Sequence, residues 1–213
     1  MSATPEAPGP DCALCPRLAA YRAENRAAHG DWHNAPVPSF GGLDARVLVV
    51  GLAPGVRGAN RTGRPFTGDF AGTLLYQTLL KVGLAEGSYG ATPADGLRLR
   101  DCRVTNAVRC VPPKNLPTPE ETGICNRFLA AELAAMPRLV AVLALGGLAH
   151  RAVLRARGLR ASHVPFGHGK LHRLPDGLVL ADSYHVSRLN TNTGRLTTEM
   201  FESVAKDLVA LAQ

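Results

Sequence analysis

The sequence predicts an α/β fold, a three-layer α/β/α sandwich whose middle layer is a four-stranded parallel sheet. Short apolar runs alternate along the chain with longer segments of helical periodicity, a pattern typical of a parallel sheet covered by helices on both faces. Because 46% of the 213 residues are hydrophobic and only 19% are charged, the chain can bury a sizeable core. We expect one domain over residues 11–213, preceded by a disordered tail over residues 1–10.

The four expected strands are short, apolar segments. The first reads RVLVVG and ends in glycine, and the third reads LVAVLAL. Uninterrupted apolar runs of this length are typical of strands that are buried on both faces of a parallel sheet. The strands are expected at residues 46–51, 102–107, 139–145 and 178–182.

The expected helices have apolar residues three or four positions apart, and each follows a strand. The helix at 119–136 begins with Pro119, Glu120 and Glu121, residues favoured in a first helical turn. The other helices are expected at 71–83, 148–157 and 197–211.

Strand-end loops are expected to form the functional site, because open parallel sheets bind ligands beyond the carboxyl ends of their strands. The most unusual sequence of the chain lies in these loops. They span residues 51–69, 106–116, 146–147 and 183–194.

Charge and composition restrict the partners. The net charge of +7 suits a polyanion, since a guanidinium group binds phosphate through two donors at once. No stretch approaches the roughly 18 apolar residues that a membrane helix requires, and the N-terminus has no signal pattern. We therefore expect a cytoplasmic protein without membrane contact, and nothing in the sequence requires more than a monomer.

Four of the five cysteines are spaced as metal ligands. Cys12 and Cys15 form a C-x2-C pair, and Cys110 and Cys125 are able to complete a tetrahedral thiolate site for zinc or for an iron–sulfur cluster. The spacing does not choose the metal. The alternative is a redox or chance pair together with two packing cysteines. Cys102 lies in an expected strand, a position typical of an ordinary buried thiol.

The loop at residues 51–69 reads GLAPGVRGANRTGRPFTGD. Its many glycines allow backbone N–H groups to approach a ligand closely. It lacks the G-K-[ST] of a phosphate-binding loop and the GxGxxG of a dinucleotide site, which argues against nucleotide-phosphate chemistry. The loop offers an aromatic ring, Phe66, and a carboxylate, Asp69. The alternative roles are a core position for Phe66 and a helix N-cap for Asp69.

The segment at residues 183–194 reads SYHVSRLNTNTG. His185 lies beyond a strand end and is followed by small polar residues and one leucine, a composition that suits a segment entering a DNA groove. In isolation such a histidine is more often a hydrogen-bonded structural residue.

Together these segments resemble the uracil-DNA glycosylase superfamily, and specifically its iron–sulfur type-5 branch. The resemblance covers about residues 12–201 and rests on the glycine-rich loop, on TNAVRCVPP, on SYHVSRLNTNTGRLT and on the cysteine spacing. It implies a parallel four-stranded sheet between helices. It also implies a structural [4Fe–4S] cluster held by Cys12, Cys15, Cys110 and Cys125.

The resemblance further implies hydrolysis of the N-glycosidic bond of a uracil flipped out of double-stranded DNA. Gly51, Phe66 and Asn106 would bind the base: Phe66 would stack on it, and the Asn106 amide would read its edge. His185 would stabilise charge at uracil O2, and Asp69 would orient the water. Because the chain carries Leu52 where many relatives have a polar residue, Asp69 bears more of this role than usual.

Three residues are expected at the DNA: Ser187 and Arg188 on phosphates, and Leu189 in the space that the base vacates. No lysine is required for a Schiff base, so hydrolysis without strand cleavage is expected. The resemblance also implies that this chain accepts other damaged bases such as hypoxanthine or ethenocytosine. The competing functions are a non-catalytic, metal-stabilised nucleic-acid-binding domain and a hydrolase of free nucleosides.

Overall fold

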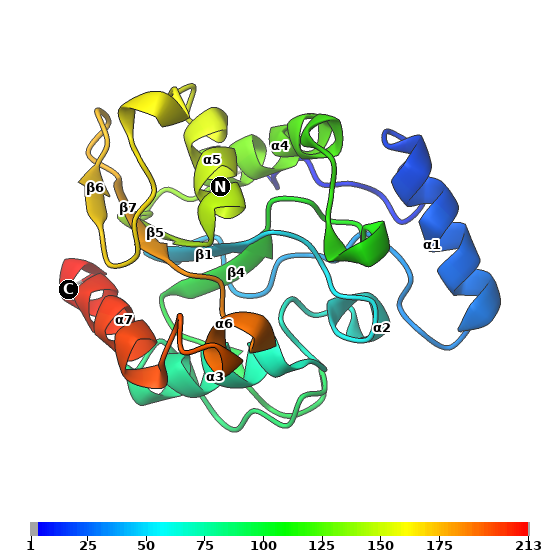
Figure 1. Cartoon of the computed structure of the whole chain (residues 1–213), viewed down its shortest axis with the longest axis horizontal. Helices are drawn as coiled ribbons and strands as arrows, with labels where there is room; N and C mark the ends of the chain where they lie inside the picture. Colours follow the sequence, from blue (N-terminus) through cyan, green and yellow to red (C-terminus); the bar gives the residue numbers. More distant parts are fainter. Residues whose placement is uncertain (1–3, 213) are drawn as a thin grey trace.

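The computed structural model describes residues 4–212 and contains a five-stranded sheet between two layers of helices (Figure 1). Four strands are parallel, as expected, and they lie at the predicted positions. The fifth strand, β6, pairs antiparallel with β7 at the sheet edge. In sheet order the strands are β4 (Cys102–Asn106), β1 (Val47–Gly51), β5 (Ala141–Leu145), β7 (Val179–Ser183) and β6 (Leu171–Arg173).

The prediction of four strands thus missed β6. Its three residues read Leu-His-Arg and are partly or fully exposed, so no apolar run marks this strand. Edge strands of this kind are short and polar, which limits pairing with other chains.

Two helices cover each face of the sheet. Helices α3 (Phe70–Lys81) and α7 (Thr198–Ala212) pack on the face that carries Val47 and Val49. Helices α4 (Pro119–Ala134) and α5 (Gly147–Ala156) pack on the face that carries Leu48. Figure 1 shows the two pairs on either side of the strands. Alternate residues of β1 point to opposite faces, so this strand takes part in both cores.

A third, smaller core joins α1 (Pro16–Ala28) to the rest of the molecule. Leu18 of this helix packs with Val108, Cys110, Cys125 and Phe128. Helix α1 was not predicted, because its sequence is rich in Ala and charged residues and has no side-chain N-cap. The remaining short elements are α2 (Ala59–Thr62), β2 (Ala85–Glu86), β3 (Arg98–Leu99), η1 (Pro113–Asn115), η2 (Ala161–His163) and α6 (Arg188–Asn192).

The chain before α1 has no regular secondary structure from residue 4 to residue 10. Within this part, Glu6 pairs with Arg127 at 2.8 Å. The first three residues of the expected tail lie outside the described residues. Among residues 4–212, no helix is long and apolar enough to cross a membrane.

Candidate active site

One cavity brings together six of the site residues that the sequence predicts. It has a volume of about 550 Å³ and lies where β1, β4 and β7 end. This volume is within the range of pockets that bind small molecules. The predicted residues that line it are Phe66, Asp69, Asn106, His185, Ser187 and Arg188.

Asn106 is the last residue of β4, lines this cavity and carries a buried acceptor without a partner. Its side chain is buried, with 3% of the residue exposed, and its Oδ1 has no hydrogen-bond partner. A buried polar atom without a partner costs about 1–3 kcal/mol. A ligand that donates a hydrogen bond to Oδ1 would recover this cost.

Phe66 lies against the ends of β1 and β4. A β-carbon at position 51 would overlap both the Phe66 ring and Oδ1 of Asn106, so Gly51 is the residue that allows this approach. The backbone of Phe66 is left-handed, with φ of 52°, which is an uncommon and strained conformation for an aromatic residue. The ring centroid of Phe66 lies 6.2 Å from that of His185. Two aromatic rings therefore face the same cavity.

Asp69 is both a helix cap and a cavity residue. Its Oδ1 accepts a hydrogen bond from the Gly72 N–H at 3.3 Å, at the start of α3. Its Oδ2 lies so close to the backbone of Gly58 that a β-carbon there would overlap it. Burial raises the pKa of this carboxyl above its usual range, against the opposing effect of the backbone hydrogen bonds. Asp69 therefore does cap α3, which was the alternative role, and it also lines the cavity.

His185 lies shortly after β7, and contacts of the surrounding backbone fix its position. The Asn190 side chain donates to the His185 carbonyl at 2.8 Å, and the next residue, Val186, is fully buried. Burial lowers the pKa of the imidazole, so the ring is neutral at neutral pH and retains one N–H donor.

The rim of the cavity carries the residues expected at DNA. Ser187 accepts from the Asn190 N–H at 3.4 Å and caps α6. Arg188 is exposed, and its guanidinium lies 5.3 Å from the Phe70 ring centroid. Leu189, the residue after Arg188, is 73% exposed.

Cys12, Cys15, Cys110 and Cys125 line one small pocket between α1, α4 and the segment after β4. The Cys125 Sγ accepts from the Arg109 N–H at 3.4 Å, and the Cys110 Sγ accepts from Arg22 at 3.5 Å. Burial raises the pKa of Cys110 and Cys125 to about 11, so thiolates at this site require a cation. The fifth cysteine, Cys102, is buried in β4, as predicted.

The chain matches the family model of the uracil DNA glycosylase superfamily over residues 38–209. It belongs to this superfamily.

Curated relatives agree with this assignment over nearly the whole chain. A type-5 uracil-DNA glycosylase of Thermus thermophilus is 50% identical over 206 residues, which are 94% of each chain. The type-5 uracil-DNA glycosylase of Pyrobaculum aerophilum is 45% identical over 94% of this chain and 88% of its own. That of Mycobacterium bovis is 42% identical over 94% of this chain and 78% of its own.

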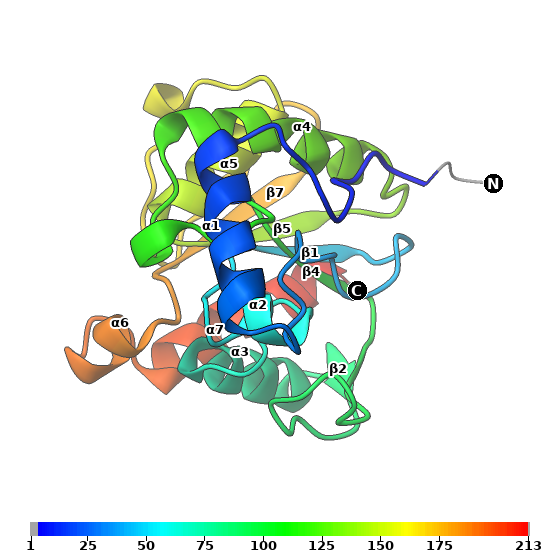
Figure 2. The same ribbon diagram turned by 90° about the vertical axis from the view of Figure 1, so that its right-hand side faces the viewer.

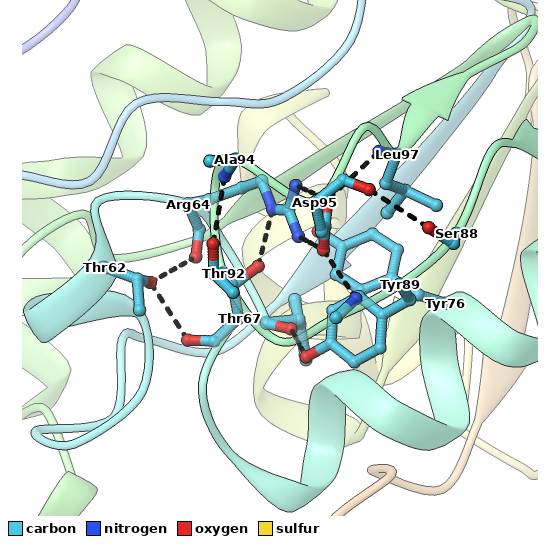
Figure 3. A network of polar contacts seen from close by, with 12 residues as sticks. Thr62, Arg64, Thr67, Tyr76, Ser88, Tyr89, Thr92, Ala94, Asp95 and Leu97 are labelled. Carbon is cyan, nitrogen blue, oxygen red and sulfur yellow. Dashed lines mark hydrogen bonds and ion pairs between the residues drawn. The ribbon is translucent and has the colours of Figure 1, made fainter.

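An ion-pair network supports the glycine-rich loop of this superfamily member (Figure 3). The buried Arg64 binds Asp95 through two hydrogen bonds of 2.8 and 2.6 Å. Its guanidinium also lies 5.1–5.9 Å from the ring centroids of Phe40, Tyr76 and Tyr89.

The aromatic partners of Arg64 in turn hold the strained residue in the cavity. Tyr76 donates to the Pro65 carbonyl at 2.6 Å and Tyr89 donates to the Phe66 carbonyl at 3.2 Å. The network therefore fixes the backbone on both sides of the Phe66 ring.

Replacing Arg64 with Lys should lower the free energy of unfolding by about 1–3 kcal/mol, because an ammonium group cannot reproduce the bidentate pair. Denaturant unfolding measures this change. The control is Arg98→Lys, whose pair with Glu86 at 2.9 Å is exposed and should contribute little. The Arg64 pair holds the pKa of Asp95 well below its usual range, so its contribution is present at neutral pH and is lost as the pH falls through that lowered pKa. Equal effects of the two substitutions at pH 7 would contradict this account.

A second buried network holds β7, the strand that precedes His185. Asp182 of β7 is fully buried, and its Oδ1 lies 2.7 Å from the Nδ1 of His150. The other nitrogen of His150 lies 2.7 Å from the Val164 carbonyl, so both ring nitrogens face acceptors. Oδ2 of Asp182 contacts His172 Nε2 at 3.0 Å and accepts from the Gly167 N–H at 3.1 Å. These contacts fix the end of β7 three residues before His185.

Several residues of the cavity were not predicted as site residues, among them Phe70 and Asn115. Asn115 lies in the loop after β4 and has a left-handed backbone, with φ of 56°. The sequence signal for this turn was the Lys114-Asn115 pair between prolines, since asparagine is among the residues that adopt a left-handed backbone most readily. Its approach to the cavity depends on the tertiary path of the loop.

Proposed function

We propose that this chain is a monofunctional uracil-DNA glycosylase that hydrolyses the N-glycosidic bond of a uracil extruded from double-stranded DNA. One observation carries the proposal: the buried Oδ1 of Asn106 has no hydrogen-bond partner, and Asn106 lines one cavity together with Phe66 and His185. Membership of the superfamily and the named relatives supply the reaction class.

The Asn106 amide matches the edge of uracil. Its Oδ1 accepts from uracil N3–H, and its NH2 group donates to O4. Cytosine presents an acceptor at N3 and a donor at the adjacent exocyclic group, so both hydrogen bonds are lost and buried polar groups remain unpaired. This mismatch costs about 1–3 kcal/mol per group. Phe66 stacks on the same ring, a contact worth about 1–3 kcal/mol.

Two residues act on the charges that develop as the bond breaks. The base departs with negative charge, and His185 donates from its neutral imidazole to uracil O2 as an oxyanion donor. The sugar becomes electron-poor, and the carboxylate of Asp69 orients the attacking water and offsets this positive charge. The remaining Oδ2 of Asp69 is the atom for this task, because Oδ1 caps α3.

The exposed rim engages the duplex. Extrusion of a base costs a few kcal/mol, and the enzyme must recover this cost. Ser187 and Arg188 contact phosphates, and Leu189 fills the gap in the base stack.

The four cysteines hold a structural [4Fe–4S] cluster. A single zinc ion with bonds of about 2.3 Å would bring its sulfur ligands to roughly 3.8 Å from one another. Among the described residues, the one group of three candidate ligand atoms within 4.8 Å of one another is formed by His150, His172 and Asp182, not by the cysteines. The wider spacing and the two N–H···S contacts fit a multi-iron cluster. The cluster ties α1 and α4 to the segment after β4.

Replacing Cys110 with Ala should remove the brown colour and the bound iron, about four atoms per chain, and should lower thermal stability. The matched control is Cys102→Ala, which removes a buried thiol outside this pocket and should retain both colour and iron. Iron analysis and visible absorbance of anaerobically prepared protein measure the result. Zinc in place of iron, or loss of colour in both variants, would contradict the assignment.

The test of the proposed function uses a labelled duplex with a single uracil, followed by alkali. Site-specific cleavage only after alkali supports a monofunctional glycosylase, and cleavage without alkali contradicts that part. Binding without base release would instead support a non-catalytic nucleic-acid-binding domain. Release from a free nucleoside but not from the duplex would support a nucleoside hydrolase.

A further inference from the structure

Exposed apolar side chains gather around the cavity. Among the described residues, five large hydrophobic side chains are exposed, namely Leu14, Phe70, Leu116, Leu171 and Leu189. Phe70 lines the cavity, and Leu189 follows the cavity residue Arg188. Leu116, which is 59% exposed, follows the cavity residue Asn115. Exposed apolar residues that border a site indicate a surface that contacts a partner.

The turn that carries Leu116 is rigid. Pro112 and Pro113 precede it and Pro117 follows it, and proline restricts the backbone. Lys114 and Asn115 both have left-handed backbones, with φ of 56°. A lysine in this conformation is strained and persists only where the surroundings hold it, and such strain is concentrated at functional sites. The turn therefore presents Leu116 to solvent in a fixed position, with little further entropy to lose on contact.

One exposed cation neighbours this leucine, and a second, Arg17, is balanced by an ion pair with Glu121. Lys114 is exposed, and Arg17 donates to the Leu116 carbonyl at 3.3 Å while its guanidinium pairs with Glu121 at 2.6 Å. An apolar tip with a flanking exposed lysine suits a partner that combines phosphates with stacked rings.

The turn and α6 project from the same side of the molecule. Figure 2 shows the green turn at residues 113–115 and the orange α6 on the left side, at different heights. Residues of both line the one cavity. The cavity mouth thus has two exposed leucines on two separate elements.

We propose that Leu116 is a second apolar wedge, which enters the base stack of the duplex beside the extruded nucleotide while Leu189 enters from α6. This inference rests on the proposed function. Leu116 supports the opened duplex. In single-stranded DNA the uracil is already unstacked, and Leu116 then does not contribute to its release. Its contribution is therefore specific to double-stranded substrate.

The test compares Leu116→Ala with Leu171→Ala, a matched control that removes an exposed leucine on β6, 44% exposed. Single-turnover release of uracil is measured on a duplex and on the single strand of the same sequence. Leu116→Ala should slow release from the duplex about tenfold and leave release from the single strand within about twofold of wild type. Leu171→Ala should match wild type on both substrates. Affinity for a duplex with a stable abasic analogue, which requires no catalysis, should also fall about tenfold in Leu116→Ala alone.

Two outcomes would overturn the wedge. The first is a duplex rate and an abasic-duplex affinity of Leu116→Ala equal to those of Leu171→Ala. The second is an equal loss on duplex and single strand, which would indicate a role in the cavity instead. Failure of wild type to release uracil from either substrate would refute the proposed function, and the abasic-duplex affinities would still decide the role of Leu116.

Discussion

Asp69→Asn should slow uracil release by about 10²–10⁴-fold, the usual range for loss of a positioned acid–base group. The substitution removes the charge that orients water and offsets positive charge on the sugar. Asparagine caps a helix about as well as aspartate does, so α3 should remain capped.

The same variant should be at least as stable as wild type at neutral pH. Burial raises the pKa of Asp69, so the stability that this carboxyl contributes is present at low pH, in its protonated form, and is lost as the pH rises through the raised pKa. At pH 7 the buried charge is a cost, and Asn removes it. Asp69→Ala is the comparison, because it also loses the cap, at about 0.5–2 kcal/mol.

Single-turnover kinetics and thermal unfolding of the two variants measure these effects. The wild-type rate should fall as the pH decreases through the raised pKa of Asp69, and Asp69→Asn should lack this acidic limb. A stable Asp69→Asn variant with near-wild-type rates would remove Asp69 from the chemistry and leave it only as a cap.

His185→Ala should reduce uracil release by about 10²–10³-fold, the effect expected when an oxyanion donor is lost. Because burial lowers the pKa of His185, the donor is a neutral imidazole at pH 7, and its contribution to the rate should not titrate at alkaline pH. Binding of the duplex should change little, since the donor acts on charge that develops during bond cleavage.

The control for this prediction is His163→Ala, which removes an exposed histidine of η2. Rates and duplex affinities are measured for both variants. A loss confined to duplex affinity in His185→Ala would place the residue in DNA binding and would contradict the assigned role.

The parallel core was predictable because strands buried on both faces leave unbroken apolar runs such as VLVVG. The cavity residues were predictable because strand-end loops meet at one sheet edge, which brings Asn106 and His185 together. In contrast, β6 and α1 lack a clear apolar pattern. The Arg64–Asp95 pair joins residues 31 positions apart in sequence, and neither residue carries a local signal of its partner. Asn115 was missed because its place at the cavity depends on the path of a proline-bracketed turn.

Inhibition by free bases tests the central claim most directly, namely that the unpaired Oδ1 of Asn106 reads the N3–H of uracil. Uracil and 3-methyluracil share ring and carbonyl groups, but the methylated base has no N3–H donor. The account predicts that uracil inhibits base release from the duplex, with an inhibition constant at least about tenfold higher for 3-methyluracil, as expected when a buried acceptor stays unpaired. Equal inhibition by the two bases would contradict it.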